Sequence, residues 1–160
     1  MTPLRIVCVG RLKESYWKDA QSEYVKRLSR LSPVEVVELE DEKEPASRSP
    51  ALMARVKDAE GARILGRLAP GDYVLALCVG AKQPTSEGFA AHLAQLHAAG
   101  HGQVTLVIGG SLGLSDAVLA RADEKLGLSE MTLPHQLCRV VLLEQLYRAA
   151  KINAGERYHK

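Results

Sequence analysis

The chain has 160 residues, of which 46% are hydrophobic and 25% are charged, and its formal net charge is +2. This composition is typical of a soluble globular protein, and the length suits a single domain over residues 1–160. No apolar run reaches the ~18 residues that span a membrane, and the N-terminus does not resemble a signal peptide. The cysteines, Cys8, Cys78 and Cys138, stand singly in apolar runs and predict reduced, buried thiols in a cytoplasmic protein.

The small net charge conceals a separation of basic and acidic segments. Residues 1–30 hold seven Lys or Arg against three Asp or Glu, and residues 139–160 hold five against two. Residues 31–60 are acidic, with four basic against eight acidic side chains. If the basic ends meet in space or across a dimer, they form a positive surface for a polyanion. The alternative is a set of ordinary solvated helix faces, because no block of like charges occurs.

Apolar runs and helical periodicity alternate along the first half of the chain. Residues 4–9 predict a buried strand, and the apolar residues of 14–31 recur at the spacing of an amphipathic helix. Residues 34–39 predict a second strand, and a charged loop with two prolines separates it from a helix over 51–68. The wholly apolar run 73–79 predicts a third, central strand.

The second half of the chain continues this alternation. Hydroxyl residues and an acid open a predicted helix over 85–99, and residues 104–108 predict a fourth buried strand. A helix that begins at 115 is expected to reach about 126, and residues 129–133 predict a short fifth strand or an extended loop. The final helix begins near Pro134 and runs to about Ile152. This order predicts an α/β fold with a mostly parallel sheet flanked by helices.

Three loops are expected to follow the carboxyl ends of strands, where open α/β sheets bind ligands: 80–82, 109–113 and 129–134. The sequence Gly-Gly-Ser-Leu-Gly at 109–113 either allows backbone to approach a ligand closely or forms a tight turn. It lacks the spacing of a dinucleotide-binding or P-loop motif. Residues 129–134 offer backbone and hydroxyl groups that suit an adenine or a methionine-like tail, or else an edge strand with a cap.

The final helix carries an arginine where an apolar residue is expected. On a helical wheel, Leu142, Leu143, Leu146 and Ala150 surround Arg139. A guanidinium in an apolar face must be paired with another group or must serve a function, because it cannot lose its charge. Arg139 therefore predicts either a functional role or a buried ion pair or bond to loop carbonyls. The helix is apolar over most of its circumference, which either a single core or a symmetric dimer explains.

The histidines divide into two groups. Three lie in or just after the predicted helix 85–99 without a nearby thiol or carboxylate in sequence, so no metal site is predicted. His135 occupies a first-turn position of the final helix. His159 lies in the C-terminal tail, where it has no part in a core, and this favours a functional role. Tyr158 beside it has a ring that can stack on a base.

Motifs spread along the whole chain resemble the ribosomal RNA large subunit methyltransferase H family, and they occur in the family's order. They are Val9-Gly10-Arg11-Leu12-Lys13, Tyr16-Trp17, Tyr24, Ile108-Gly109-Gly110, Thr132-Leu133-Pro134-His135, Arg139-Val140, Glu144-Gln145, Tyr147-Arg148-Ala149 and Tyr158-His159-Lys160. The resemblance implies a SPOUT-superfamily fold with a C-terminal trefoil knot, a homodimer, and S-adenosylmethionine as methyl donor. It also implies methylation of N3 of a pseudouridine in the 23S rRNA of the assembled ribosome, with neither DNA nor a membrane as partner.

The same resemblance implies a cofactor site at the three predicted loops. One departure from the family is Cys78, where the family often has an acidic residue, and another is Ala81, where it often has glycine. These two positions affect the expected shape of the first loop and not its location. Carried over by motif, the cofactor-binding residues are Leu77, Gly109, Gly110, Ser129, Glu130, Met131, Thr132, Leu133 and Pro134.

Transfer of a methyl group to N3 requires that N3 lose a proton, so a base or an anion-stabilising cation is expected. We assign the catalytic set to Arg139, which stabilises developing negative charge or orients the base, and to His135, Tyr158 and His159. Tyr158 and His159 are expected to engage the target from the partner subunit, and to be ordered only when that subunit or RNA is present. Three alternatives remain open: a nucleotide-binding or sulfur-transfer enzyme, a methyltransferase acting on another RNA site, and a non-catalytic ribosome-binding module.

Overall fold

A single parallel sheet forms the centre of the molecule in a computed structural model, which describes residues 2–160. Its strand order is β2-β1-β4-β3-β5, and every neighbouring pair is parallel. The predicted mostly parallel α/β sheet is therefore confirmed. The strands are β1 (Leu4–Val9), β2 (Val34–Leu39), β3 (Asp72–Leu77), β4 (Gln103–Ile108) and β5 (Glu124–Leu126).

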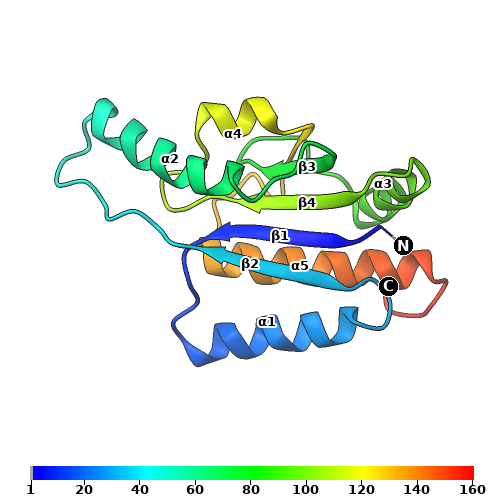
Figure 1. Cartoon of the computed structure of the whole chain (residues 1–160). Helices are drawn as coiled ribbons and strands as arrows, with labels where there is room; N and C mark the ends of the chain where they lie inside the picture. The colour runs from blue at the N-terminus through cyan, green and yellow to red at the C-terminus, as the bar shows by residue number, and fades with distance from the viewer. Residues whose placement is uncertain (1) are drawn as a thin grey trace.

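Within residues 2–160, five helices cover the two faces of this sheet. The helices α1, α3 and α5 lie on one face, where α5 packs between the other two, and α2 and α4 lie on the opposite face (Figure 1). The predicted starts of α3 near Thr85 and of α5 near Pro134 are confirmed. The helices are α1 (Ser15–Leu28), α2 (Pro50–Leu65), α3 (Ser86–Ala98), α4 (Asp116–Arg121) and α5 (His135–Asn153).

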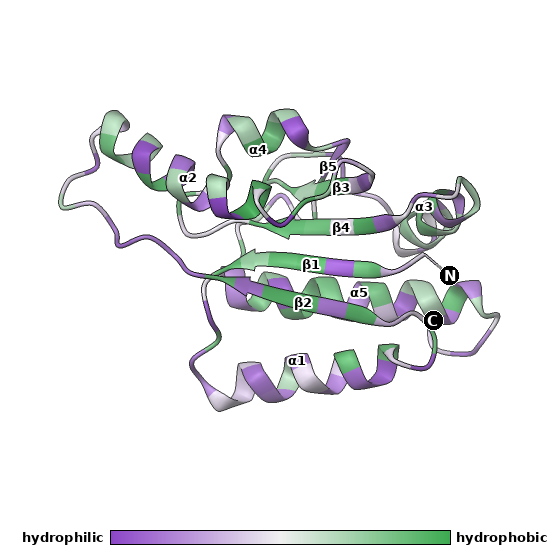
Figure 2. Cartoon of the chain, in the orientation of Figure 1, coloured by the Kyte–Doolittle hydropathy of each residue, from purple (hydrophilic) through white to green (hydrophobic). Residues whose placement is uncertain are grey.

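The core lies on both faces of the central strands. In β4, five consecutive residues over 104–108 are buried, and all of them except Thr105 are apolar, as expected of a strand covered on both faces. Figure 2 shows the same apolar character along β1 and β4, with polar residues on the outward sides of the helices. The larger core cluster joins α1, α3 and α5 to the sheet, and a smaller one joins α2 and α4 to it.

The fifth strand differs from the prediction. The helix expected to reach Leu126 ends at Arg121, and the strand lies at Glu124–Leu126 instead of 129–133. Asp123 causes this early change, because its backbone N–H donates to the carbonyl of Val74 at 2.9 Å and its carboxylate accepts from Val74 N–H at 2.7 Å. Residues 129–133 form the predicted alternative, an extended loop, in which Ser129 Oγ accepts from the N–H of Met131 at 3.0 Å.

The segment after β5 passes close to the loop after β3. The N–H of Gly127 donates to the carbonyl of Lys82 at 3.0 Å, and a Cβ atom at Gly127 would lie 2.3 Å from the carbonyl oxygen of Ala81. Only glycine allows this approach, so the C-terminal segment is fixed against the 78–82 loop before it enters α5. The trefoil knot stays a prediction. Among residues 2–160, every helix is too short or too polar to cross a lipid bilayer.

Candidate functional site

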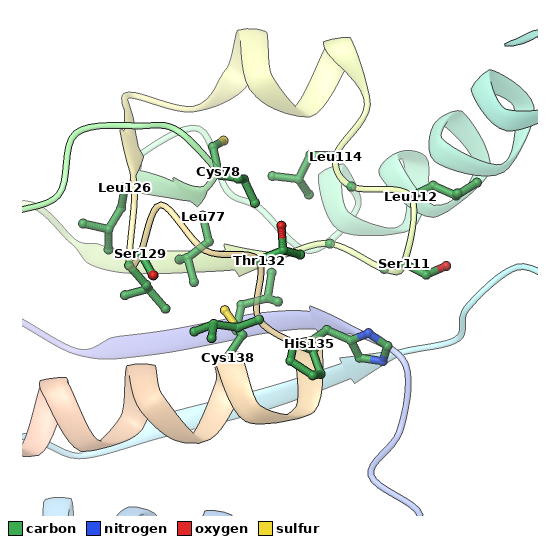
Figure 3. Close-up of a pocket in the computed structure, with 18 of the residues that line it drawn as sticks. Leu77, Cys78, Ser111, Leu112, Leu114, Leu126, Ser129, Thr132, His135 and Cys138 are labelled. Atoms are coloured by element: carbon green, nitrogen blue, oxygen red, sulfur yellow. The ribbon is translucent and has the colours of Figure 1, made fainter.

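A cavity of about 740 Å³ lies at the carboxyl ends of β3 and β4, beside the first turn of α5 (Figure 3). This is the edge where parallel sheets bind ligands, and the volume is in the range of small-molecule sites. The cavity is mainly apolar, with a few hydroxyl, backbone and imidazole groups. Its walls are Leu77–Val79, Ile108–Leu114, Leu119, Leu126, Leu128, Ser129 and Met131–His135, together with Cys138.

The glycine loop 109–113 forms one wall of this cavity. Gly113 has φ +88°, and its N–H donates to the carbonyl of Gly110 at 3.1 Å, so the segment is a tight turn. A Cβ atom at Gly109 would lie 2.9 Å from the carbonyl carbon of Gly113, and one at Gly110 would lie 2.8 Å from Glu60 Oε1. The predicted tight turn is therefore confirmed, and close approach of a ligand to its backbone stays a prediction.

The structure brings together eight of the nine predicted cofactor-binding residues. Leu77, Gly109, Gly110 and four residues of the 129–133 loop line the cavity, as does Pro134. Glu130 is exposed and does not line it. The sequence reasoning missed the apolar side chains of the lining, such as Leu112, Leu114 and Leu119. Their position directly after the glycines is a signal that could have identified the first two.

Cys8 is buried as predicted, whereas Cys78 and Cys138 are only partly buried, because they lie in the cavity wall. Burial raises the pKa of the Cys138 thiol, and it raises the pKa of Cys78 against the opposing charge of Lys125. Thiols with raised pKa values stay protonated at neutral pH and are poor nucleophiles. Cys78 and Cys138 therefore give this part of the cavity a neutral wall.

His135 is the titratable side chain with the clearest access to the cavity. It is half-buried in the first turn of α5 and lines the cavity, and Figure 3 shows its ring beside the end of β1. Burial lowers the pKa of His135, the charge of Arg139 lowers it further, and Asp41 opposes the shift. An imidazole with a lowered pKa is neutral at physiological pH, and a neutral imidazole can accept a proton.

Arg139 lies one turn after His135 and does not line the cavity. Its residue is 1% exposed, and its guanidinium pairs with Glu38 Oε2 at 2.5 Å. It also donates to Gln21 Oε1 and to the carbonyl of Gly10, each at 3.1 Å. The predicted ion pair and the predicted bond to a loop carbonyl are thus both present. They tie α5 to α1, to β2 and to the loop that follows β1.

The C-terminal tail packs against its own chain, which differs from the expectation that it is ordered only with a partner or RNA. The hydroxyl of Tyr158 donates to Glu144 Oε1 at 3.1 Å, and its ring packs edge-on against Tyr147 at 4.8 Å. The guanidinium of Arg148 lies 4.9 Å from the centre of the Tyr158 ring. These contacts supply enough stacking and hydrogen bonding to hold the tail in a single chain.

Both ring nitrogens of His159 are also engaged. Arg148 lies 3.2 Å from Nδ1, and Nε2 lies 2.7 Å from Glu87 Oε1. Since an arginine can only donate, Nδ1 accepts and the proton of the neutral ring is on Nε2. Arg148 lies thirteen residues after His135, which is about 20 Å along the helix axis. Within one chain, the tail is therefore held away from the cavity.

His92 and His97 form contacts away from the cavity. His97 Nδ1 lies 2.6 Å from the backbone nitrogen of Thr2, and His92 Nε2 lies 2.8 Å from Glu124 Oε2. Among residues 2–160, no group of three or more His, Cys, Asp or Glu is arranged to hold a metal ion.

A family model described as "Predicted SPOUT methyltransferase" matches residues 2–159. The chain is 52% identical, over 157 residues, to "Ribosomal RNA large subunit methyltransferase H" of Lactobacillus johnsonii, with 98% of this chain and 99% of that protein covered. The protein of the same name from Bacillus thuringiensis is also 52% identical, with the same coverage.

Solved structures share the fold at low sequence identity. A methylase family protein from Neisseria gonorrhoeae superposes with a TM-score of 0.56 and 14% identity, covering 99% of this chain and 87% of that one. A methylase family protein from Haemophilus influenzae Rd KW20 gives a TM-score of 0.53 and 13% identity, covering 99% of this chain and 71% of that one.

Proposed function

The chain belongs to the SPOUT methyltransferase family, and on that premise we propose that it methylates N3 of a pseudouridine in the 23S rRNA of the assembled ribosome. S-adenosylmethionine is the methyl donor, and the reaction takes place in the cytoplasm. The observation that carries the proposal is the glycine-walled cavity beside a neutral histidine. The names of the curated relatives, which match along almost the full chain, support ribosomal RNA as the substrate.

The walls of the cavity offer the bare backbone, apolar side chains and hydrogen-bonding groups that a bound donor requires. The bare backbone of Gly109 and Gly110 accommodates a flat ring or a ribose at close range, and a side chain at either position would collide with neighbouring atoms. Leu77 and the 129–134 loop supply apolar contacts and backbone hydrogen-bonding groups on the other side. When bound, the donor supplies an electrophilic methyl group on a sulfonium. The residues of the chain hold and orient it, because alignment is the main requirement of such a transfer.

His135 is the base in this proposal. It borders the cavity, its pKa is lowered, and neither of its ring nitrogens has a hydrogen-bond partner among residues 2–160. It can therefore accept the N3 proton as the nitrogen attacks the methyl group. Arg139 is buried and does not reach the cavity, which supports the second of its two predicted roles. It is a positioning residue that orients the base by fixing the first turn of α5 against Gly10.

The active form is a homodimer in this proposal. The middle of α5 holds the tail of the same chain away from His135, so only a second chain can bring a tail to the cavity. Because Tyr158 and His159 are bound to groups of their own chain, they reach the partner as a rigid unit. Tyr158 and His159 contact the target nucleotide. They do not accept the N3 proton, which passes to His135.

The basic segments supply the contact with RNA. Arg11 and Lys13 are exposed directly after β1, at the same edge of the sheet as the cavity. Arg157 and Lys160 are exposed in the tail. Lysine and arginine side chains neutralise phosphates and release counterions, which makes binding dependent on salt. A non-catalytic ribosome-binding module would use the same side chains and would not need the cavity.

Two measurements test the proposal together. Calorimetric titration with S-adenosylmethionine is expected to show binding at micromolar concentration. Mass mapping of 23S rRNA is expected to show one new methyl group after purified protein and donor are added to ribosomes from cells that lack it. Donor binding without any methylated nucleotide would contradict the substrate, and absence of donor binding would favour the non-catalytic module.

A further inference from the structure

Glu60 is a buried carboxylate in the second half of α2. Only 4% of the residue is exposed. Its Oε2 atom accepts a hydrogen bond from the backbone N–H of Glu42 at 3.1 Å. Its Oε1 atom has no hydrogen-bond partner among residues 2–160. A buried acceptor without a partner costs free energy.

This carboxylate lies directly behind the wall of the cavity. A Cβ atom at Gly110 would lie 2.8 Å from Glu60 Oε1 and 3.0 Å from Oε2. The next residue, Gly61, packs against the other end of the same loop, because its Cβ would lie 2.3 Å from Ser115 Oγ. The helix α2 therefore supports the loop at both ends and places a charge behind a residue that has no side chain.

The surroundings of Glu60 are negative. The acidic segment 40–44 follows β2, and its Glu42 and Glu44 approach Glu60 and Ser111 respectively. Arg63, one turn after Glu60, is paired with Glu42 and donates to the carbonyl of Glu40 at 2.8 Å.

Burial raises the pKa of the Glu60 carboxyl. The hydrogen bond from the N–H of Glu42 opposes this rise, Asp41 adds to it, and Arg63 opposes it. A cation in the cavity would favour the ionised carboxylate and compensate its burial.

We propose that Glu60 is a specificity-determining residue that distinguishes the methyl donor from the spent product by charge. The proposal rests on the placement of the donor in this cavity. In the transfer, the N3 proton passes to His135 as N3 bonds to the methyl carbon, the bond between sulfur and methyl breaks, and its electron pair stays on sulfur. The cationic sulfonium of S-adenosylmethionine thereby becomes the neutral thioether of S-adenosylhomocysteine. The attraction to Glu60 ends with the reaction, so product release is favoured.

The test compares the dissociation constants of S-adenosylmethionine and S-adenosylhomocysteine, measured by calorimetry on the full chain. Glu60→Gln keeps the shape of the side chain and an acceptor for Glu42, and it removes the charge. We expect the preference for the donor over the product to fall about tenfold, which corresponds to about 1.4 kcal/mol. Donor binding should weaken, while product binding should stay within twofold of the wild-type value.

The matched control is Glu44→Gln, an exposed carboxyl at the same loop. Its charge is screened by water, so the ratio of the two constants should stay at the wild-type value. An equal change for both ligands in Glu60→Gln would overturn the proposal, because a residue that only supports the loop affects both. If the wild-type protein binds neither ligand, the proposed function itself fails.

A second measurement keeps the proposal testable if Glu60→Gln does not fold, which thermal unfolding would reveal. The wild-type protein is titrated with a donor analogue that carries an ammonium group on carbon in place of the sulfonium. Both cationic ligands should bind more tightly than the thioether. A thioether that binds as tightly as the two cations would overturn the role of Glu60.

Discussion

The first turn of α5 and its second half make opposite use of polar side chains. At the first turn, His135 lines a cavity, and one turn later Arg139 keeps one buried nitrogen, Nε, without a partner among residues 2–160. In the second half, Glu144 and Arg148 bind each other and also hold Tyr158 and His159. The start of the helix therefore keeps polar groups that have no protein partner within residues 2–160 and are available to interact with a ligand. In the second half, the polar groups bind one another and fix the tail.

We infer from this difference that the first turn of α5 carries out proton transfer and that the second half positions the tail. A base needs a ring nitrogen that is free to accept a proton, and His135 has one, while both nitrogens of His159 are engaged. The two regions belong to one helix, so the test of this division is to substitute each and compare the losses.

The largest loss is expected for His135→Asn, which removes the base and keeps a polar side chain of similar size. Single-turnover methyl transfer to ribosomes should fall by roughly 10²–10⁴-fold, the usual range for general-base catalysis. Donor affinity by calorimetry should change less than about twofold, because the substitution leaves the glycine wall intact. His97→Asn is the control, since that ring lies in α3 against Thr2, and it should retain the wild-type rate.

The pH dependence of the same rate follows from the lowered pKa of His135. The neutral ring is the active form, so the rate should be constant at neutral pH and should fall only at pH values below the ordinary value of 6.5. A rate that falls on acidification already above this value would indicate another base.

A smaller loss is expected for Arg139→Lys. Lysine keeps the charge and can form one or two of the three contacts, so transfer should fall about 10- to 100-fold and the free energy of unfolding by about 1–3 kcal/mol. Denaturant unfolding and single-turnover rates measure the two effects. The matched control is Arg148→Lys on the same helix, which should lose less of both. Equal losses at Arg139 and Arg148 would contradict the division between the two regions.

Deletion of Tyr158–Lys160 should reduce transfer about tenfold, with donor binding unchanged, because the tail only positions the target. Mixing this chain with His135→Asn chains provides a sharper version. If the tail acts across the dimer, the mixed dimer has one site with an intact cavity and an intact tail, and activity returns. If each chain uses its own tail, both sites stay defective and mixing restores nothing.

The smallest effect concerns the ionisation of Tyr158. Burial, and then the bond to Glu144, raise the pKa of this hydroxyl to about 12. Because the folded value exceeds the ordinary value of 10, the contact stabilises the docked tail below pH 10 and is lost as pH rises through 12. Ultraviolet titration should show two late tyrosines, because burial and a hydrogen bond to Glu124 also raise the pKa of Tyr73, and Glu144→Gln should shift only Tyr158 toward 10. A titration unchanged by Glu144→Gln would show that the tail is not docked there.

The sequence predicted the sheet where strands are buried on both sides. Residues 4–9 and 104–108 are apolar except for Arg5 and Thr105, and no tertiary information was needed to recognise them as strands. β5 was misplaced because it has three residues, two of them charged, and its position depends on the pairing of Asp123 with Val74. A pairing of residues 49 positions apart leaves no local periodicity.

The loops of the site were predictable from the sequence, whereas the contacts that depend on the fold were not. The loops at 109–113 and 129–134 could be found because glycine and proline mark them, and strand order then brings them together. Glu60 could not be found, because a glutamate in a helix looks like a solvated residue until the fold buries it against Gly110. The docking of the tail likewise depends on Glu87, which is 72 residues away from His159.

The passage of Gly127 beside Ala81 has a consequence for the synthesis of the protein. The cavity is built from residues 77–79, 108–114 and 126–138, and the last of these segments is made near the end of translation. Until Gly127 is seated against the 78–82 loop, one wall and the base are absent, so a nascent or truncated chain has no complete site. In this proposal the enzyme becomes competent only when the ribosome that makes it has nearly finished the chain, and its substrate is then another, assembled ribosome.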